Sequence, residues 1–154
     1  MCNFIHLHNH SYYSTLDGLN SPKAMVNKAI QLGHDALAIT DHGTLAGAID
    51  FHRSATKEGV KPILGCEFYM QTDGETEEMR SQTNHHLLCI AYNQTGWQNL
   101  IKLSTWAETE NFYYRPRITF EKLAEWNEGL ITTTGCMASI IHYYLLGKNA
   151  FARS

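Results

Sequence analysis

Short apolar runs alternate with helical patterns along this chain, and the alternation predicts a series of βα units. The first helical pattern shows how such a segment is bounded: Ser21 and Pro22 are typical of a helix start, and Gly33 of a helix end. The predicted strands cover residues 4–10, 35–40, 61–70, 86–92 and 130–134. The predicted helices cover residues 22–32, 44–58, 95–108, 119–126 and 137–146. The sequence therefore predicts an α/β fold with about five βα units and a parallel sheet.

Three segments lie outside this alternation. We expect an exposed loop at the polar and acidic residues 72–84, an irregular aromatic and basic connection at 112–117, and a tail at 148–154. Five units are too few to close a barrel of seven or eight strands, and the chain is shorter than the roughly 250 residues of a complete eight-stranded α/β barrel. We expect one domain over residues 1–147, an incomplete barrel that is truncated at its C-terminal end.

Composition and charge narrow the class of protein. With 154 residues, 44% of them hydrophobic, the chain can bury the core of one domain, and its net charge of −3 provides no strongly basic surface for nucleic acid. No apolar run approaches the roughly eighteen residues that cross a bilayer, and the first residues lack a secretory pattern. We therefore expect a cytoplasmic protein with no membrane partner. The four scattered cysteines are expected to be reduced thiols, and histidine is unusually frequent, with nine residues.

Three of the histidines alternate in the first predicted strand, in the segment FIHLHNHS. Alternate side chains of a strand share a face, so His6, His8 and His10 are expected to point the same way. Imidazole is the commonest metal-ligating side chain, and several imidazoles on one face favour a metal site. The alternative is a polar strand face with solvated histidines.

A second group lies where the next strand ends, in the segment ITDHGTLAG. Sites in parallel α/β folds gather at the C-terminal ends of strands, which makes His42 a candidate ligand. Asp and Gly are also ordinary turn residues, so Asp41 is alternatively a residue that caps the turn.

Isolated polar residues mark three further strands. Glu67 lies inside the apolar segment ILGCEFYM, and a buried carboxylate must be paired with a cation or bound to a metal. One of His85 and His86, at the start of the fourth predicted strand, is expected to face the same end of the sheet. Cys136 follows the fifth strand; the alternative is that its thiol is a small core side chain.

Taken together and in order, these motifs resemble one known family. The segments FIHLHNHS, STLDG, AITDHGTLAG, KPILGCEFYM, HHLLCIAYNQTGWQNLIKLST and GLITTTGC are similar to those of the PHP (polymerase and histidinol phosphatase) domain. The form that they resemble most is the one at the N-terminus of bacterial DNA polymerase III alpha subunits. The resemblance implies a distorted (β/α)7 barrel, of which this chain holds an incomplete part, with up to three divalent metals at the C-terminal ends of its strands.

The resemblance also implies a ligand set. The family's metal positions correspond to seven residues of this sequence, which are His8, His10, Asp17, His42, Glu67, His86 and Cys136. Glu67 corresponds to a carboxylate that bridges metals, and Asp17 and His42 are the further residues with an implied catalytic role. His6 falls beside the ligands, and the family's remaining Asp-x-His pair does not follow Cys136. Histidines with carboxylates and one thiolate suit zinc best, with manganese as the second choice.

The function implied by the resemblance is metal-dependent phosphoester hydrolysis, of a 3′-5′ exonuclease (proofreading) or pyrophosphatase type. The expected substrate is DNA or another phosphate ester, and the expected partner is the rest of a replicative DNA polymerase. Two alternatives are a non-catalytic, metal-stapled scaffold of such a polymerase and a stand-alone phosphatase of the histidinol-phosphatase type. Nothing in the sequence resembles a polymerase palm, so this chain alone is not expected to polymerise DNA. His34, His52 and His142 are expected to have no role in the site.

Overall fold

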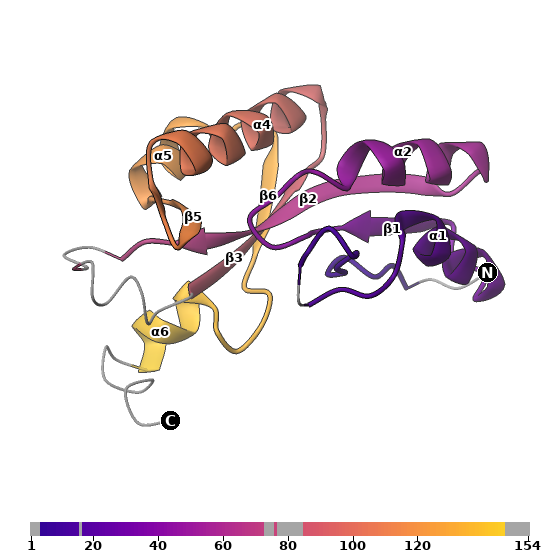
Figure 1. The fold of residues 1–154 in the computed structure, drawn as a ribbon, viewed down its shortest axis with the longest axis horizontal. Helices are drawn as coiled ribbons and strands as arrows, with labels where there is room; N and C mark the ends of the chain where they lie inside the picture. Colours follow the sequence, from indigo (N-terminus) through magenta and orange to yellow (C-terminus); the bar gives the residue numbers. More distant parts are fainter. Residues whose placement is uncertain (1–3, 16, 73–75, 77–84, 147–154) are drawn as a thin grey trace.

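The computed structural model describes residues 4–15, 17–72, 76 and 85–146, and shows a mixed sheet with helices packed against it (Figure 1). The strands are β1 (Ala36–Ile39), β2 (Lys61–Met70), β3 (His85–Ala91), β4 (Phe112–Tyr113), β5 (Arg115–Ile118) and β6 (Leu130–Thr133). The helices are α1 (Pro22–Gln31), α2 (Ala48–Lys57), α4 (Gln94–Thr109), α5 (Phe120–Glu125) and α6 (Ile140–Leu146). The predicted tail and most of the predicted loop at 72–84 lie outside the described residues.

The long strand β2 organises the sheet because its two halves have different neighbours. Residues 61–64 pair in parallel with β1, and residues 65–70 pair antiparallel with β3. At Tyr69 and Met70, β2 also pairs in parallel with β5. The order across the sheet is β4-β5-β2-β3-β6, with β1 beside the first half of β2. The end of β2 is therefore covered by strands on both sides.

The predicted parallel sheet is only partly correct. The α/β class and the parallel pair β1–β2, connected by α2, are confirmed, but β3 runs antiparallel to both β2 and β6. A parallel neighbour requires a crossover segment that packs on the sheet, usually a helix with an apolar face. Residues 71–84 between β2 and β3 are polar and acidic and provide no such face.

The strand predicted over residues 4–10 does not form. Its backbone follows β1, with Ala38 N donating to His6 O (3.1 Å) and Thr40 N donating to Asn9 O (2.9 Å). The acceptors His6 and Asn9 are three positions apart in sequence, whereas the donors Ala38 and Thr40 are two positions apart. This segment therefore carries one extra residue relative to β1, as in a β-bulge. The Asn9 side chain donates to the carbonyls of His6 and Ala38, which replaces regular ladder bonds.

The segment predicted to be an irregular connection at residues 112–117 is instead a tight hairpin. β4 and β5 pair antiparallel, with Tyr113 beside Arg115, so Tyr114 alone forms the tip. Tyr114 has a φ of 58°, the left-handed conformation that a one-residue tip imposes. The buried guanidinium of Arg117 anchors this hairpin, since its Nη1 donates to the Tyr113 carbonyl (2.9 Å).

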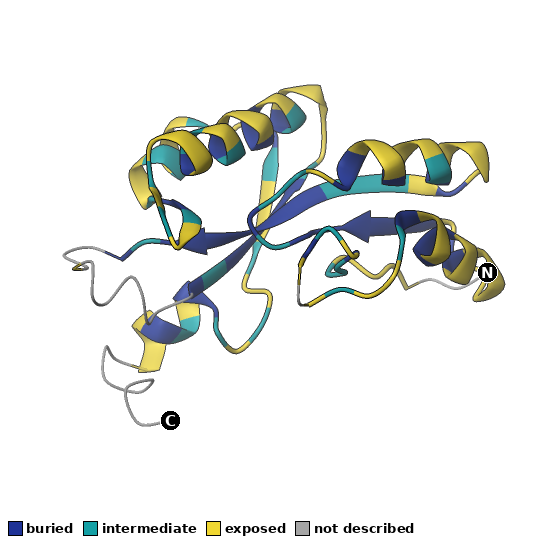
Figure 2. Cartoon of the chain, viewed as in Figure 1, coloured by how far each residue is buried: buried dark blue, intermediate teal, exposed yellow. Residues whose placement is uncertain are grey.

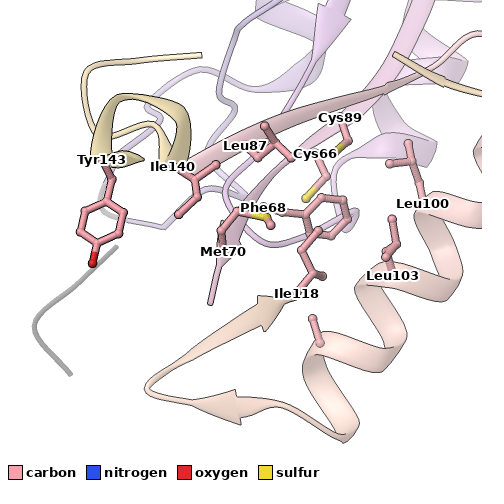
Figure 3. Close-up of a cluster of buried hydrophobic side chains, with 11 residues drawn as sticks. Cys66, Phe68, Met70, Leu87, Cys89, Leu100, Leu103, Ile118, Ile140 and Tyr143 are labelled. Carbon is pink, nitrogen blue, oxygen red and sulfur yellow. The ribbon is translucent and has the colours of Figure 1, made fainter. Parts of the chain in front are cut away.

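Two apolar clusters hold the layers together, and the inward faces of the helices are buried while their outer faces are exposed (Figure 2). The first lies between α1, α2 and β1, around Val26, Ile39 and Phe51. The second lies between α4 and the strands β2 and β3, where Leu100 and Leu103 point toward Phe68 (Figure 3). Within the described part of the chain, no helix has the length and apolar character that crossing a membrane requires.

The alternation of β2 connects this core to a polar site. Cys66, Phe68 and Met70 are buried in the α4 cluster. Because successive side chains of a strand point to opposite faces, Glu67 and Tyr69 project from the other face. The core on one face thus fixes the position of a buried carboxylate on the other.

The contact between α4 and the turn before β6 provides a test of the packing. A Cβ at Gly96 would lie 1.9 Å from the Gly129 carbonyl oxygen, so helix and turn would have to separate. We expect Gly96→Ala to lower the free energy of unfolding by about 2 kcal/mol, although alanine is the better helix former. Gln98→Ala, at an exposed position of the same helix, should change it by less than about 0.5 kcal/mol. Equal denaturant midpoints for the two variants would contradict this packing.

Candidate metal centre

The carboxylate of Glu67 lies at the centre of a histidine cluster and is fully buried. Its Oε2 lies 2.7 Å from His8 Nε2, 2.8 Å from His10 Nε2 and 3.4 Å from His42 Nδ1. Its Oε1 lies 3.2 Å from His86 Nδ1. Four imidazole rings therefore surround one carboxylate. No lysine or arginine among the described residues forms an ion pair with it, so the alternative of a simple ion pair does not apply.

Backbone pairing brings two of these rings to Glu67. Beyond the end of β1, His42 forms an isolated parallel bridge with Glu67, and Gly43 N donates to the Glu67 carbonyl (2.9 Å). On the other side, His86 pairs with Tyr69, which shares the Glu67 face of β2. The antiparallel direction of β3 matters here, because it places the start of β3 at the end of β2.

A loop between the first segment and α1 contributes Asp17. The Asp17 carboxylate contacts His10 Nδ1 and lies 3.5 Å from His42 Nε2. The Ser14 hydroxyl donates to Asp17 Oδ2 (3.2 Å) and accepts from His42 N (3.2 Å), so it joins the loop to the end of β1. Gly18 is required in this loop, since a Cβ there would lie 1.9 Å from the carbonyl oxygen of Ser11.

Asp41 holds the same loop through hydrogen bonds and is not one of the residues of the cluster. Its buried carboxylate accepts hydrogen bonds from Ser11 N (2.6 Å) and Ser11 Oγ (2.8 Å). Burial raises the pKa of Asp41, and the two bonds from Ser11 oppose that effect. The sequence left open whether Asp41 is structural, and these bonds give it a structural role.

Cys136 completes the cluster from the turn after β6. Its Sγ lies 3.3 Å from His86 Nδ1, and the preceding Gly135 adopts a φ of 67°. Burial raises the pKa of the Cys136 thiol, and the negative charge of Glu67 raises it further. Cys136 is half-buried and so differs from the fully buried Cys66 and Cys89.

The electrostatics of the cluster are dominated by the competition between burial and charge. Burial by itself raises the pKa of the Glu67 carboxyl, but hydrogen bonds from His10 and His8 outweigh it and hold this pKa well below its usual range. Burial by itself lowers the pKa of His10, but the hydrogen bond to Glu67 and the charge of Asp17 raise it above the ordinary value. Burial lowers the pKa of His42 to about 4, so its ring is neutral at pH 7, the form that ligates metals.

The donor set fits a metal ion. Two buried atoms of the cluster, Glu67 Oε1 and His42 Nδ1, have no hydrogen-bond partner among the described residues. The cluster contains three groups whose ligand atoms lie within 4.8 Å of one another: His8, His10 and Glu67; His10, Asp17 and His42; and His42, Glu67 and His86. Imidazole nitrogens, carboxylate oxygens and one thiol are the ligands that zinc takes in proteins.

The structure brings all seven residues of the predicted ligand set into this one cluster, namely His8, His10, Asp17, His42, Glu67, His86 and Cys136. The prediction that His6 shares a face with His8 and His10 is wrong. The His6 ring lies 5.3 Å from the ring of His34 and 4.7 Å from that of Phe4, because the extra residue in its segment turns it away.

Sequence reasoning missed the residues that support the cluster. Tyr69, whose ring stacks on His42 at 5.5 Å, was detectable, because it lies two residues after Glu67 on the same strand face. Ser11 and Ser14 gave no signal in the sequence. His52 of α2 and His142 of α6 belong to none of the three groups.

A pocket of about 480 Å³ opens beside the cluster. Asp17, His42 and His86 line it on one side, and Tyr114 and Arg115 of the hairpin also line it. Its volume lies in the range of small-molecule binding sites. The cluster is therefore accessible to a ligand through this pocket.

Comparison with known proteins decides the family. The profile of the PHP domain family matches residues 6–154, nearly the whole chain. The chain belongs to the PHP domain family. A solved structure of a proposed metal-dependent phosphoesterase from Bifidobacterium adolescentis matches this PHP domain with a TM-score of 0.48 and 22% identity, over 83% of this chain and 45% of its own.

DNA polymerase III alpha subunits are among the curated relatives of this PHP domain. The DNA polymerase III subunit alpha of Helicobacter pylori is 41% identical over 146 residues, which cover 95% of this chain and 12% of the relative. That of Treponema pallidum is 43% identical over 146 residues, with coverage of 93% and 12%. That of Aquifex aeolicus is 42% identical over 149 residues, with coverage of 92% and 13%. The chain thus spans only about 12% of the length of the curated relatives it matches.

The bonds of Asp41 give a test of how the PHP domain holds its ligand loop. In Asp41→Ala, both Ser11 donors would lose their acceptor. We expect the free energy of unfolding to fall by about 2 kcal/mol or more, the usual effect of an unsatisfied buried donor. Asp35→Ala, at an exposed position just before β1, should leave it nearly unchanged. Urea unfolding of both variants measures the difference, and equal stabilities would show that Asp41 does not hold the loop.

Proposed function

We propose that this PHP domain is a metal-dependent phosphoesterase within a bacterial DNA polymerase III alpha subunit. The observation that carries the proposal is the buried Glu67 carboxylate, which four imidazole rings surround beside an open pocket. A protein that only needed a stable core would not bury a carboxylate among histidines at the base of a pocket, because desolvating these groups opposes folding. The polymerase relatives support the replicative setting over a stand-alone histidinol-phosphatase-like enzyme.

We assign the ligands to three metal positions. His8, His10 and Glu67 hold one ion; Glu67, His86 and Cys136 hold a second; Asp17 and His42 hold a third. The distances support this assignment, since Glu67 contacts His8 and His10 through one oxygen and lies beside His86 with the other. Glu67 is then the bridging carboxylate. Zinc is the preferred ion, because of the thiol, and manganese is the second choice.

Bound divalent ions would supply a clamp for a phosphate and a water of lowered pKa for attack on phosphorus. Two residues of the chain, His42 and Asp17, have proposed roles in this chemistry. His42, whose pKa of about 4 keeps it neutral, presents a free nitrogen lone pair at physiological pH. Asp17 faces the pocket and is oriented by the Ser14 hydroxyl, so its carboxylate is placed to hold or accept a proton near the substrate.

The finer parts of the proposal concern substrate and setting. DNA in a 3′-5′ exonuclease reaction and pyrophosphate are the two candidate substrates, and the rest of the polymerase is the partner. A replication role in bacteria places the protein in the cytoplasm. The division into a PHP domain over residues 1–147 and a tail over 148–154 stays a prediction.

A non-catalytic, metal-stapled scaffold is the second candidate. It is favoured by the origin of the ligands, which come from six separate segments: the first extended segment, the loop before α1, the end of β1, β2, the start of β3 and the turn after β6. A metal held by such ligands would fix these segments to one another whether or not hydrolysis occurs.

Metal binding is the first expected outcome. Protein purified without chelator should contain at least about one equivalent of zinc or manganese, measured by elemental analysis. Zinc at a hundredfold excess over its dissociation constant should stabilise the fold by about 2.7 kcal/mol. For a chain of this size this is a rise in melting temperature of roughly 5–10 °C. His8→Ala/His10→Ala should reduce both effects, because it removes two ligands of the first position and leaves those of the second in place.

His52→Ala is the control, since His52 is exposed on α2 and distant from the cluster. Alkylation of Cys136 gives a second measurement: a metal-bound thiolate is shielded, and chelation should expose it. Cys89 should stay protected in both states, because it is fully buried. The metal site would be excluded if zinc left the melting temperature unchanged and Cys136 were alkylated equally with and without chelator.

Hydrolysis is the second expected outcome and separates the enzyme from the scaffold. The metal-loaded chain should hydrolyse bis(p-nitrophenyl) phosphate faster than free zinc or manganese does. Glu67→Gln should lower this rate by about 100-fold or more, because loss of even an outer partner of a metal ligand commonly lowers activity by 10–100-fold. Glu121→Gln, exposed on α5, is the matched control. Metal binding without hydrolysis above the free-metal rate would favour the scaffold.

A further inference from the structure

The pocket beside the metal centre has a second wall that the proposed chemistry does not use. This part of the lining comes from the β4–β5 hairpin, whose Arg115 and Tyr114 line the pocket together with Asp17, His42 and His86. The hairpin is joined to the sheet because β5 pairs with β2, and its two strands are held together by the bond from the buried Arg117 to the Tyr113 carbonyl. Its side chains are therefore held in a fixed position relative to the cluster.

Arg115 is the cationic side chain of this pocket among the described residues that line it. Its Nη1 donates to the hydroxyl of Tyr69 (3.0 Å), and its guanidinium carbon lies 5.0 Å from the Tyr69 ring centre. Tyr69 in turn stacks on His42 at 5.5 Å. One tyrosine thus connects Arg115 to the cluster and orients it.

The guanidinium of Arg115 can bind a ligand in addition to the Tyr69 hydroxyl. In the described part of the chain, no carboxylate lies within ion-pair distance of its guanidinium, although Glu108 also lines the pocket. A guanidinium has five N–H donors, and phosphate is one of the two groups that match its forked geometry. An exposed arginine that is held in place by a tyrosine hydroxyl beside a candidate phosphoesterase centre is therefore suited to a phosphate.

Tyr114 supplies an aromatic surface at the rim. It is 73% exposed and sits at the hairpin tip with a φ of 58°. Glycine adopts this conformation without strain, whereas a bulky residue does so at a penalty. A large, exposed ring at a position that favours glycine needs a reason outside the fold, and stacking on a base is one that aromatic side chains commonly serve.

We propose that this pocket binds one nucleoside monophosphate unit of the substrate, with Arg115 contacting its phosphate and Tyr114 stacking on its base. The inference rests on the proposed phosphoesterase function and deepens it, because it makes a nucleotide chain the substrate class and excludes pyrophosphate. Arg115 and Tyr114 are then the residues that determine specificity, while the metal ligands carry the reaction.

The test measures equilibrium binding of dAMP to the full chain by calorimetry, with zinc and again with chelator. Ribose 5-phosphate is the probe that lacks a base. Arg115→Met keeps an unbranched stem of four atoms and removes the charged guanidinium, and Arg53→Met, exposed on α2, is its matched control. Loss of a charge-assisted hydrogen bond should weaken dAMP and ribose 5-phosphate alike by about tenfold. Arg53→Met should weaken neither.

Tyr114→Gly separates a binding role from a structural one. It relieves the strained conformation, so the melting temperature should stay equal or rise. Its affinity for dAMP should nevertheless fall by about tenfold, the usual contribution of one stacked base, while ribose 5-phosphate binding is unchanged. A structural role would instead lower the melting temperature and spare dAMP affinity.

Two results would overturn the inference. One is equal dAMP affinity in Arg115→Met and the wild type, and the other is no measurable binding at millimolar dAMP. Failure of the phosphoesterase proposal is distinguishable, since it would show as absent metal or absent hydrolysis while the Arg115 dependence in chelator persists. Zinc content should be retained in both hairpin variants, because neither residue is a proposed metal ligand.

Discussion

The burial of the Glu67 carboxylate is the constraint on which the rest of this structure depends. An ionised carboxylate in a protein interior is stable only when groups around it replace the lost water. Here the replacement comes from imidazoles of separate segments, which hold the pKa of Glu67 well below its usual range. Each segment must therefore arrive at the same point, and much of the local structure is explained by that requirement.

The direction of β3 shows how the sheet meets this requirement. In an all-parallel sheet the start of β3 would lie at the opposite end from the end of β2, and His86 would be far from Glu67. The antiparallel pairing brings them together, since Tyr69 and Met70 pair with His86 and His85. β6 reverses direction again, so the turn that follows it returns to the same end and delivers Cys136.

The sequence predicted the parts of the fold that depend on local periodicity. The apolar run of β2 and the start of α1 at Ser21 and Pro22 predicted what the structure shows. Strand direction was mispredicted, because period-two alternation is the same for parallel and antiparallel partners. The irregular backbone at residues 4–10 was missed because it depends on Asn9, whose side chain bonds to a strand that lies about thirty residues away in sequence.

The candidate site was more predictable than the fold around it, because chemistry limits what a buried Glu67 or paired histidines can do. The residues that hold the site in place were less predictable. Asp41 and Ser11 bond across about thirty residues of sequence, and no local pattern distinguishes them from ordinary turn residues. Tyr69 could have been predicted as a neighbour of the site, because it lies two residues after Glu67 and therefore on the same face of β2.

The three candidate ligand groups overlap, so that each pair of groups has one residue in common. His10 belongs to the first and second groups, His42 to the second and third, and Glu67 to the first and third. In the proposed assignment, Glu67 is common to the first two metal positions, and His42 of the third position lies beside the same carboxylate. Ions bound at positions that share or adjoin one carboxylate would be thermodynamically linked, and such linkage is reciprocal. The affinity of the cluster for an ion would then depend on how many ions it already holds.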